Sequence, residues 1–226
     1  MKPKDLRFPF AQQQCCVTIA DRIWHIPPRC ETYDNFFFPG WDSPELFGNR
    51  NPVYVECCSG TGTWIAAQAA KWPHINWVAV EKRFDRVRKI WSKLKNGNLH
   101  NLIVICGEAH NATRLYFPSE SIQHLFINFP DPWPKRRHAK QRLMQPLFIE
   151  ELARILSAEA SLIFVTDDIT CGTCTWDMLK NHQHFASKIP APGYITQWDD
   201  YGSSYFEQLW RSKGRSIQYY HFLKNR

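Results

Sequence analysis

The stretch Val53-Tyr-Val-Glu-Cys-Cys-Ser-Gly-Thr-Gly62 joins an apolar run, an acid and two glycines, and the residues after it have helical apolar spacing. A short β-rich run predicts a buried strand, and glycines allow the chain to turn tightly. A strand, a glycine-containing turn and a helix in this order are typical of a parallel α/β sheet. We therefore place the start of the central sheet at residue 53.

The same alternation continues along the chain. Further strands are predicted at residues 77–80, 102–106, 125–129, 162–166, 194–197 and 216–223. Helices are predicted at residues 64–71, 84–95, 143–156 and 205–213, and within residues 173–184. Short strands that alternate with helices predict an α/β fold with a mostly parallel central sheet and helices on both faces.

The N-terminal part lacks a sustained period and carries aromatic clusters such as Phe36-Phe-Phe38. We expect residues 1–40 to be an irregular extension, packed on a domain that spans residues 41–226.

Composition restricts the class of protein. The 226 residues include 28 Lys plus Arg against 21 Asp plus Glu, a net charge of +7, which favours an anionic partner and nucleic acid first. No apolar stretch approaches the roughly 18 to 20 residues that span a bilayer, and no signal-type core follows Met1, so we expect a cytoplasmic protein without a membrane partner.

Several cysteines lie in apolar runs, which favours reduced thiols. Cys171-Gly-Thr-Cys174 lacks a second ligand pair, so no metal is expected.

Three acids follow three successive predicted strands: Glu56, Glu81 and Glu108. Ligands of open α/β sheets bind beyond the carboxyl ends of the strands. Cys58 occupies the first glycine place of the dinucleotide fingerprint, which disfavours pyrophosphate. Glu56, beside the turn, favours a cationic ligand such as a sulfonium. Glu81 could accept hydrogen bonds from ribose hydroxyls, and Glu108 could accept one from an adenine amino group. Each acid alone could equally cap a turn or helix, but the set fits S-adenosylmethionine.

Residues 128–142, NFPDPWPKRRHAKQR, follow a predicted buried strand. Alternating prolines fix φ and predict a stiff, extended loop. The loop carries one acid, Asp131, and one indole, Trp133, which could hold a planar base. A basic run that could bind phosphates follows: Lys135, Arg136, Arg137, Lys140 and Arg142. We expect Trp133 to brace the loop in preference to stacking on the base. A strand end that runs into a solvated basic helix start is the simpler alternative.

The chain resembles the bacterial tRNA (guanine-N7)-methyltransferase family from about residue 41 to the C-terminus. The resemblance depends on Phe129-Pro-Asp-Pro-Trp133 with Lys135, on Val165-Thr-Asp167 and on Ser204-Tyr-Phe-Glu207. It implies a Rossmann-like class I methyltransferase fold with an antiparallel C-terminal strand. It also implies transfer of a methyl group from S-adenosylmethionine to a guanosine in the tRNA variable loop, commonly position 46 in tRNA numbering. The enzyme would be a monomer or homodimer.

The resemblance also implies roles for individual residues. The cofactor residues would be Glu56, Gly60, Gly62, Glu81, Glu108 and Asp131, and Asp131 would also be catalytic. The residues that contact the target nucleoside would be Lys135, Asp167, Ser204, Tyr205, Phe206 and Glu207. The RNA-binding residues would be Arg136, Arg137, His138, Lys140 and Arg142.

The chain departs from the family pattern at several positions. Cys57-Cys58 stands where relatives usually have Ile-Gly, so a Cβ would narrow the turn. Glu108 replaces a common Asp, Pro134 a common His, Asp168 a common aromatic residue and Tyr205 a common Lys. Two parts of the proposed site also have simpler interpretations: Asp167 as a helix N-cap or Asx-turn, and Ser204-x-x-Glu207 as a capping box.

Other functions remain open from the sequence. A methyltransferase could act on another nucleobase, such as an adenine amino group. The chain could also be an RNA-binding module without catalysis, in which the Cys57-Cys58 turn marks a lost cofactor site. A nicotinamide oxidoreductase is disfavoured because its glycine pattern is absent.

Overall fold

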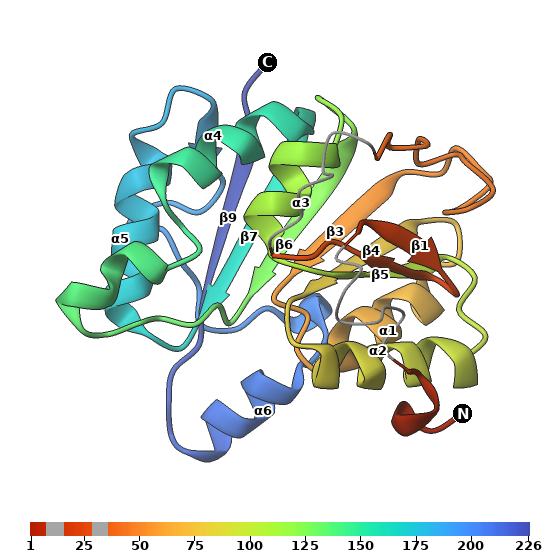
Figure 1. Ribbon diagram of the computed structural model, residues 1–226. Helices are drawn as coiled ribbons and strands as arrows, with labels where there is room; N and C mark the ends of the chain where they lie inside the picture. Colours follow the sequence, from red (N-terminus) through yellow and green to blue (C-terminus); the bar gives the residue numbers. More distant parts are fainter. Residues whose placement is uncertain (8–15, 29–35) are drawn as a thin grey trace. The chain divides into compact units, whose positions relative to one another are not determined.

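The computed structural model describes residues 1–7, 16–28 and 36–226 (Figure 1). These residues form two compact units, Met1–Phe117 and Pro118–Arg226, and we describe each by itself. Strands and helices occur in both units, as the alternating pattern predicted. The proposed extension over residues 1–40 stays a prediction, and its residues 8–15 and 29–35 lie outside the described residues.

The strands of the first unit are paired in the order β1-β2-β5-β4-β3. They are β1 (Thr18–Ala20), β2 (Ile23–His25), β3 (Val53–Cys57), β4 (Asn76–Glu81) and β5 (Leu102–Cys106). The pairs β2/β5, β5/β4 and β4/β3 are parallel, whereas β1 runs antiparallel to β2. Every residue of β4 and β5 is buried, as apolar runs covered on both faces require. The predicted strands at 53, 77 and 102 are thereby confirmed.

The helices of the first unit are α1 (Thr63–Lys71), α2 (Phe84–Asn96), α3 (Ala109–Tyr116) and the short 3-10 helix η1 (Pro3–Asp5). Both α1 and α2 pack against β4, and α2 also packs against β5. The contact face of α2 consists of Val87, Ile90, Trp91 and Leu94, which are buried and spaced as one stripe of a helix. The sequence patterns predicted α1 and α2 but missed α3.

Strands β1 and β2 were also not predicted, because three residues each are too few to show a period. Trp24 of β2 is fully buried, and its ring centroid lies 5.4 Å from Phe38 and 5.5 Å from Tyr116. Burial of such large rings is a major contribution to the stability of a core. Aromatic packing therefore attaches β2 to Tyr116 at the end of α3, while strand pairing joins it to β5.

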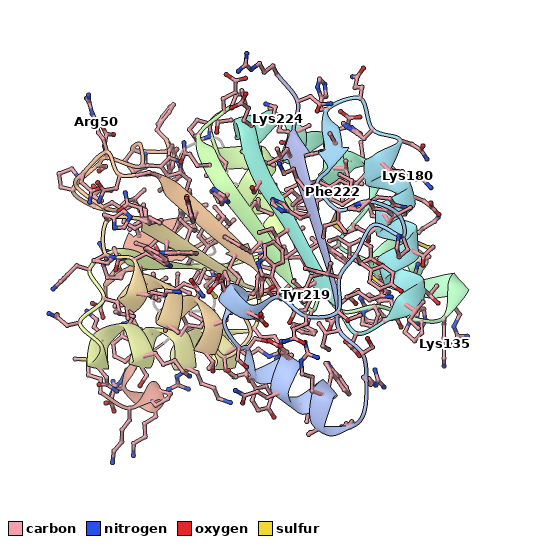
Figure 2. The ribbon with its side chains drawn as sticks, turned by 180° about the vertical axis from the view of Figure 1, so that it is seen from behind. Arg50, Lys135, Lys180, Tyr219, Phe222 and Lys224 are labelled. Atoms are coloured by element: carbon pink, nitrogen blue, oxygen red, sulfur yellow. The ribbon has the colours of Figure 1, made fainter. Side chains whose placement is uncertain are left out.

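The strands of the second unit are paired in the order β6-β7-β9-β8. They are β6 (Ile122–Asn128), β7 (Leu156–Thr166), β8 (Phe185–Ser187) and β9 (Gln218–Lys224). β6 and β7 are parallel, whereas β9, marked by Tyr219 and Phe222 in Figure 2, is antiparallel to β7 and β8. The expected antiparallel C-terminal strand is confirmed. The strand predicted at 194–197 is wrong, because only an isolated bridge joins Ile195 to Tyr219.

The helical segments of the second unit are α4 (Pro146–Ile155), α5 (Ile169–Lys180), α6 (Tyr205–Ser212), η3 (Arg136–Gln141) and η4 (Asp199–Tyr201). α4 packs on β7, and α5 packs on β7, β8 and β9. α6 buries none of its residues and lies beyond the carboxyl ends of β6 and β7 (Figure 1). Across the described residues, no helix is long and apolar enough to cross a membrane.

Candidate functional site

The turn between β3 and α1 uses left-handed backbone positions. Cys58, Gly60 and Gly62 have φ values of +64°, +55° and +71°. Glycine adopts this conformation at little cost, whereas a Cβ makes it strained. The turn is closed by a hydrogen bond of 2.9 Å from Gly62 N–H to the carbonyl of Ser59. Cys58 therefore carries the strain expected from a side chain at a glycine-like position.

Glu81 at the end of β4 holds this turn. Its Oε2 accepts a hydrogen bond of 2.9 Å from Gly60 N–H, and its Oε1 accepts one of 2.9 Å from Arg83 N–H. Only 4% of the residue is exposed. Burial raises the pKa of Glu81, although the Arg83 N–H, the nearby Arg86 charge and the Gly60 N–H act in the opposite direction. Since each oxygen has a further lone pair, the carboxylate can still accept ligand hydroxyls.

The other two strand-end acids lie at the same edge of the first unit. β3, β4 and β5 are adjacent and parallel, and their register pairs Glu56 with Ala79 and Glu81 with Cys106. Glu56 is the penultimate residue of β3 and is buried, with 2% exposure. Glu108 is exposed and precedes the first turn of α3. The topology therefore brings Glu56, Glu81, Glu108 and the glycine turn to one sheet edge.

Two thiols lie beneath this edge. Burial raises the pKa of Cys57 to about 12, and the neighbouring Glu56 charge adds to the effect. Burial, with a smaller contribution from Glu81, likewise raises the pKa of Cys106 to about 12. Both thiols are therefore neutral packing groups at physiological pH. The described cysteines are all free: Cys16, Cys57, Cys58, Cys106, Cys171 and Cys174.

Residues 128–142, the proline loop, begin at the end of β6 in the second unit. Phe129 and Trp133 have φ values of +50° and +42°, which are strained for residues with a Cβ. The hydroxyl of Tyr201 donates a hydrogen bond of 2.5 Å to Oδ1 of the buried Asn128. These constraints fix the start of the loop, and Asp131 lies exposed within it.

Arg142 closes the loop from its far end. Its guanidinium donates to the carbonyl oxygen of Pro132 at 2.9 Å and to that of Trp133 at 3.3 Å. The Trp133 ring also lies edge-on to the ring of His138, at a centroid distance of 5.7 Å. These contacts give Arg142 a role in bracing the loop, and they favour the same role for Trp133.

The rest of the basic run faces solvent. Lys135, Arg137 and Lys140 are exposed, and the side chain of Arg136 lies outside the described part of the chain. Figure 2 shows Lys135 at the outer tip of the second unit, well separated from Tyr219. Lys135 thus lies apart from Tyr219, whose hydroxyl binds Glu207, one of the acids expected to contact the target nucleoside.

Asp167 and Asp168 follow β7 and have different partners. Asp168 accepts a hydrogen bond of 2.7 Å from Cys171 N–H and so caps α5. Asp167 pairs with Arg215 at 2.5 Å, with 10% of its side chain exposed. The simpler interpretation of Asp167 as a cap therefore applies to its neighbour. That cap also explains why α5 begins before the predicted residue 173.

Ser204 and Glu207 form half of the predicted capping box. Ser204 Oγ accepts a hydrogen bond of 3.0 Å from Glu207 N–H at the start of α6. The Glu207 carboxylate instead accepts from Tyr219 Oη at 2.8 Å and from Arg211 Nε at 2.9 Å. Phe206 lies with its ring centroid 6.2 Å from that of Phe129. The segment expected to close on the nucleoside is thus linked to the proline loop.

Tyr205 is half exposed at the N-terminus of α6. Its ring lies edge-on to that of Phe206, at a centroid distance of 5.4 Å. Across the described ranges, no group of three or more His, Cys, Asp or Glu side chains could hold a metal ion.

Two solved methyltransferase structures are similar in fold to this chain. An rRNA methylase from Streptococcus thermophilus has a TM-score of 0.54 at 13% identity, over 79% of this chain and 89% of that chain. The aminoglycoside resistance methyltransferase NpmB1 has a TM-score of 0.54 at 15% identity, over 76% of this chain and 87% of that chain. The expected Rossmann-like methyltransferase fold is therefore confirmed.

Sequence comparison narrows this class to one family. The model of a family described as "Putative methyltransferase" matches residues 50–219. The tRNA (guanine-N(7)-)-methyltransferase of Chlamydia caviae is 44% identical over 224 residues, which cover 99% of this chain and 98% of that protein. The protein of the same name from Staphylococcus aureus is 39% identical over 176 residues, 76% of this chain and 80% of its own length. The chain belongs to the tRNA (guanine-N7)-methyltransferase family, as the resemblance indicated, and is an enzyme of the methyltransferase class.

Proposed function

We propose that this chain transfers a methyl group from S-adenosylmethionine to N7 of a guanosine in the variable loop of tRNA. Identity over nearly the full length to enzymes with this name supports the reaction class. The observation that carries the cofactor assignment is the hydrogen bond from Gly60 N–H to the buried Glu81, because it joins a glycine turn to an acid at a strand end.

The sheet edge of the first unit fits the chemistry of S-adenosylmethionine. The buried Glu56 carboxylate favours a cationic ligand, which a sulfonium is and a phosphate is not. Glu81 keeps lone pairs for ribose hydroxyls, and Glu108 is exposed for an amino group of adenine. Gly60 and Gly62 let backbone approach the ligand closely. When bound, the cofactor supplies an electrophilic methyl group.

Guanine N7 needs no general base, because it already exposes a lone pair. The work of the site is therefore alignment and charge stabilisation. The guanine ring becomes cationic as N7 is alkylated, and we assign the stabilising carboxylate to Asp131, which also belongs to the proposed cofactor set. The bracing of its loop by Arg142 and Asn128 supports this role, since catalytic groups act best when their position is fixed.

The basic run would bind tRNA phosphates. Arg137 and Lys140 are exposed, as is Lys135, so their charges are available to an anionic backbone. We place Arg136 and His138 in the same surface. Arg142 belongs to the loop by its contacts, and its effect on RNA would be indirect.

The test is methyl transfer from labelled S-adenosylmethionine to unmodified bulk tRNA, followed by digestion to nucleosides. We expect labelled 7-methylguanosine from the wild type and none from Asp131→Ala, with tRNA affinity retained in the variant. Label in N6-methyladenosine would favour a methyltransferase for another nucleobase. Absence of cofactor binding by calorimetry at millimolar concentration, with tRNA still bound, would favour a non-catalytic RNA-binding module.

A further inference from the structure

The two acids expected at the target guanosine are each held by only one of their carboxylate oxygens. Oδ2 of Asp167 binds Nη1 of Arg215 at 2.5 Å. Oε1 of Glu207 accepts from both Tyr219 and Arg211. Oδ1 of Asp167 and Oε2 of Glu207 accept no hydrogen bond from the residues that the structure describes. Each acid thus keeps one oxygen for a ligand.

Arg215 is itself held in position. Its guanidinium lies over the ring of Trp210, 4.2 Å from the centroid, and its backbone N–H donates to the Trp210 carbonyl at 3.0 Å. A guanidinium that rests on an aromatic face and binds a carboxylate loses most of its rotational freedom. Arg215 therefore fixes the orientation of Asp167 and joins the end of β7 to the turn after α6.

Tyr219 holds Glu207 in a comparable way. Only 1% of Tyr219 is exposed, and burial, followed by its bond to Glu207, raises the pKa of its hydroxyl to about 12. The hydroxyl therefore stays a donor at physiological pH. The ring of Tyr219 lies 5.2 Å from that of Tyr201, the residue that donates to Asn128. Glu207 is thus attached to β9 and, through aromatic packing, to the start of the proline loop.

We propose that Arg215, Tyr219 and Arg211 are positioning residues for guanine recognition. They occupy one oxygen of Asp167 and one of Glu207, so that the other oxygens accept the N1–H and amino N–H groups of guanine. An ionised carboxylate accepts hydrogen bonds and cannot donate them. Adenine presents an unprotonated N1 at the same edge, so the arrangement discriminates against it. This proposal rests on the proposed function of the chain.

The chain offers a matched control for these ion pairs. Arg226 and Glu159 form a pair of 2.8 Å in the same unit, with side chains 85% and 63% exposed. An exposed pair of this kind contributes little to stability. Arg226→Ala removes one arginine and one pair, as Arg215→Ala does, but leaves Asp167 and Glu207 unchanged.

The experiment compares two tRNA transcripts that differ at the target position, one with guanosine and one with inosine. Inosine keeps N7 and N1–H but lacks the amino group. We expect the wild type and Arg226→Ala to prefer guanosine in kcat/KM. We expect Arg215→Ala and Tyr219→Phe to lose about tenfold in kcat/KM with guanosine, and less with inosine, so that the preference shrinks. A purely structural role would lower kcat/KM by the same factor for the guanosine and the inosine transcript.

Two further measurements keep the test decisive. Thermal melting shows whether Tyr219→Phe folds, and if it does not, Arg211→Ala tests the hold on Glu207 in its place. Arg215→Lys keeps the charge without the planar fork, and we expect it to recover only part of the preference. The positioning role is overturned if the wild type is active and both folded variants keep its ratio of kcat/KM with guanosine to kcat/KM with inosine. An inactive wild type overturns the proposed function instead.

Discussion

A Cβ placed on Gly62 would lie 2.7 Å from Cγ1 of Ile90, so the start of α1 and the middle of α2 approach each other at the glycine turn. Gly62 also has a φ of +71°. The proposed cofactor turn therefore depends on this glycine for two reasons, its backbone conformation and the space beside it.

We predict that Gly62→Ala lowers the free energy of unfolding by about 2 to 4 kcal/mol and abolishes binding of S-adenosylmethionine. The matched control is Gly214→Ala. Gly214 has a φ of +73° but no atom within 4 Å of an added Cβ, so it carries only the conformational strain, which should cost about 1 to 2 kcal/mol. Equal losses in the two variants, measured by denaturant unfolding, would mean that Ile90 moves freely out of the way.

Cys58 leads to the opposite prediction. Its φ of +64° is strained for a residue with a Cβ, so Cys58→Gly should raise the free energy of unfolding by about 0.5 to 1 kcal/mol. Cys57→Gly should lower it, because Cys57 is fully buried in a strand. Thermal melts of the two variants check the pair. A destabilised Cys58→Gly would show that the thiol makes contacts that outweigh the strain.

The basic run gives a prediction on RNA affinity. Arg137→Ala with Lys140→Ala should weaken tRNA binding and reduce the slope of log affinity against log salt by about one unit for each lost phosphate contact. Arg142→Ala should lower turnover and leave the salt slope near that of the wild type, since its guanidinium binds loop carbonyls. Lys180→Ala on α5 is the charge control. A salt slope unchanged by the double variant would remove the run from the RNA surface.

His124 gives a prediction on pH. Burial, with a smaller contribution from His221, lowers its pKa from 6.5 to about 4. Between these values the unfolded chain binds a proton that the folded chain does not, so its contribution to stability is complete above pH 6.5 and is lost as the pH falls toward about 4. His124→Gln should flatten the dependence of the unfolding free energy on pH across this window. An equally steep dependence in the variant would assign the effect to other groups.

The central strands could be predicted because each is a short apolar run beside a turn signal. β3, β4 and β5 were found this way, and α1 and α2 from their apolar spacing. β1, β2 and β8 have three residues each, too few to show a period, and aromatic packing of Trp24 holds β2 in place.

The site could be predicted only where position follows from topology. Acids at the carboxyl ends of neighbouring parallel strands lie at one edge of the sheet, which explains why Glu56, Glu81 and Glu108 could be placed together from the sequence. The groups that hold the acids were missed, because Arg215 is far from Asp167 in sequence and carries no local signal. The N-cap of α5 is Asp168 and not Asp167, a difference that the sequence leaves open because two adjacent aspartates fit the same capping pattern.

The central claim is methylation at N7 of a variable-loop guanosine, and one substrate pair tests it directly. The two tRNA transcripts are identical except that one carries 7-deazaguanosine, which has carbon in place of N7, at the variable-loop target. We predict that labelled S-adenosylmethionine transfers its methyl group to the guanosine transcript and not to the deaza transcript, while both transcripts bind equally well. Equal labelling of the two transcripts would show that the enzyme methylates another atom or another position.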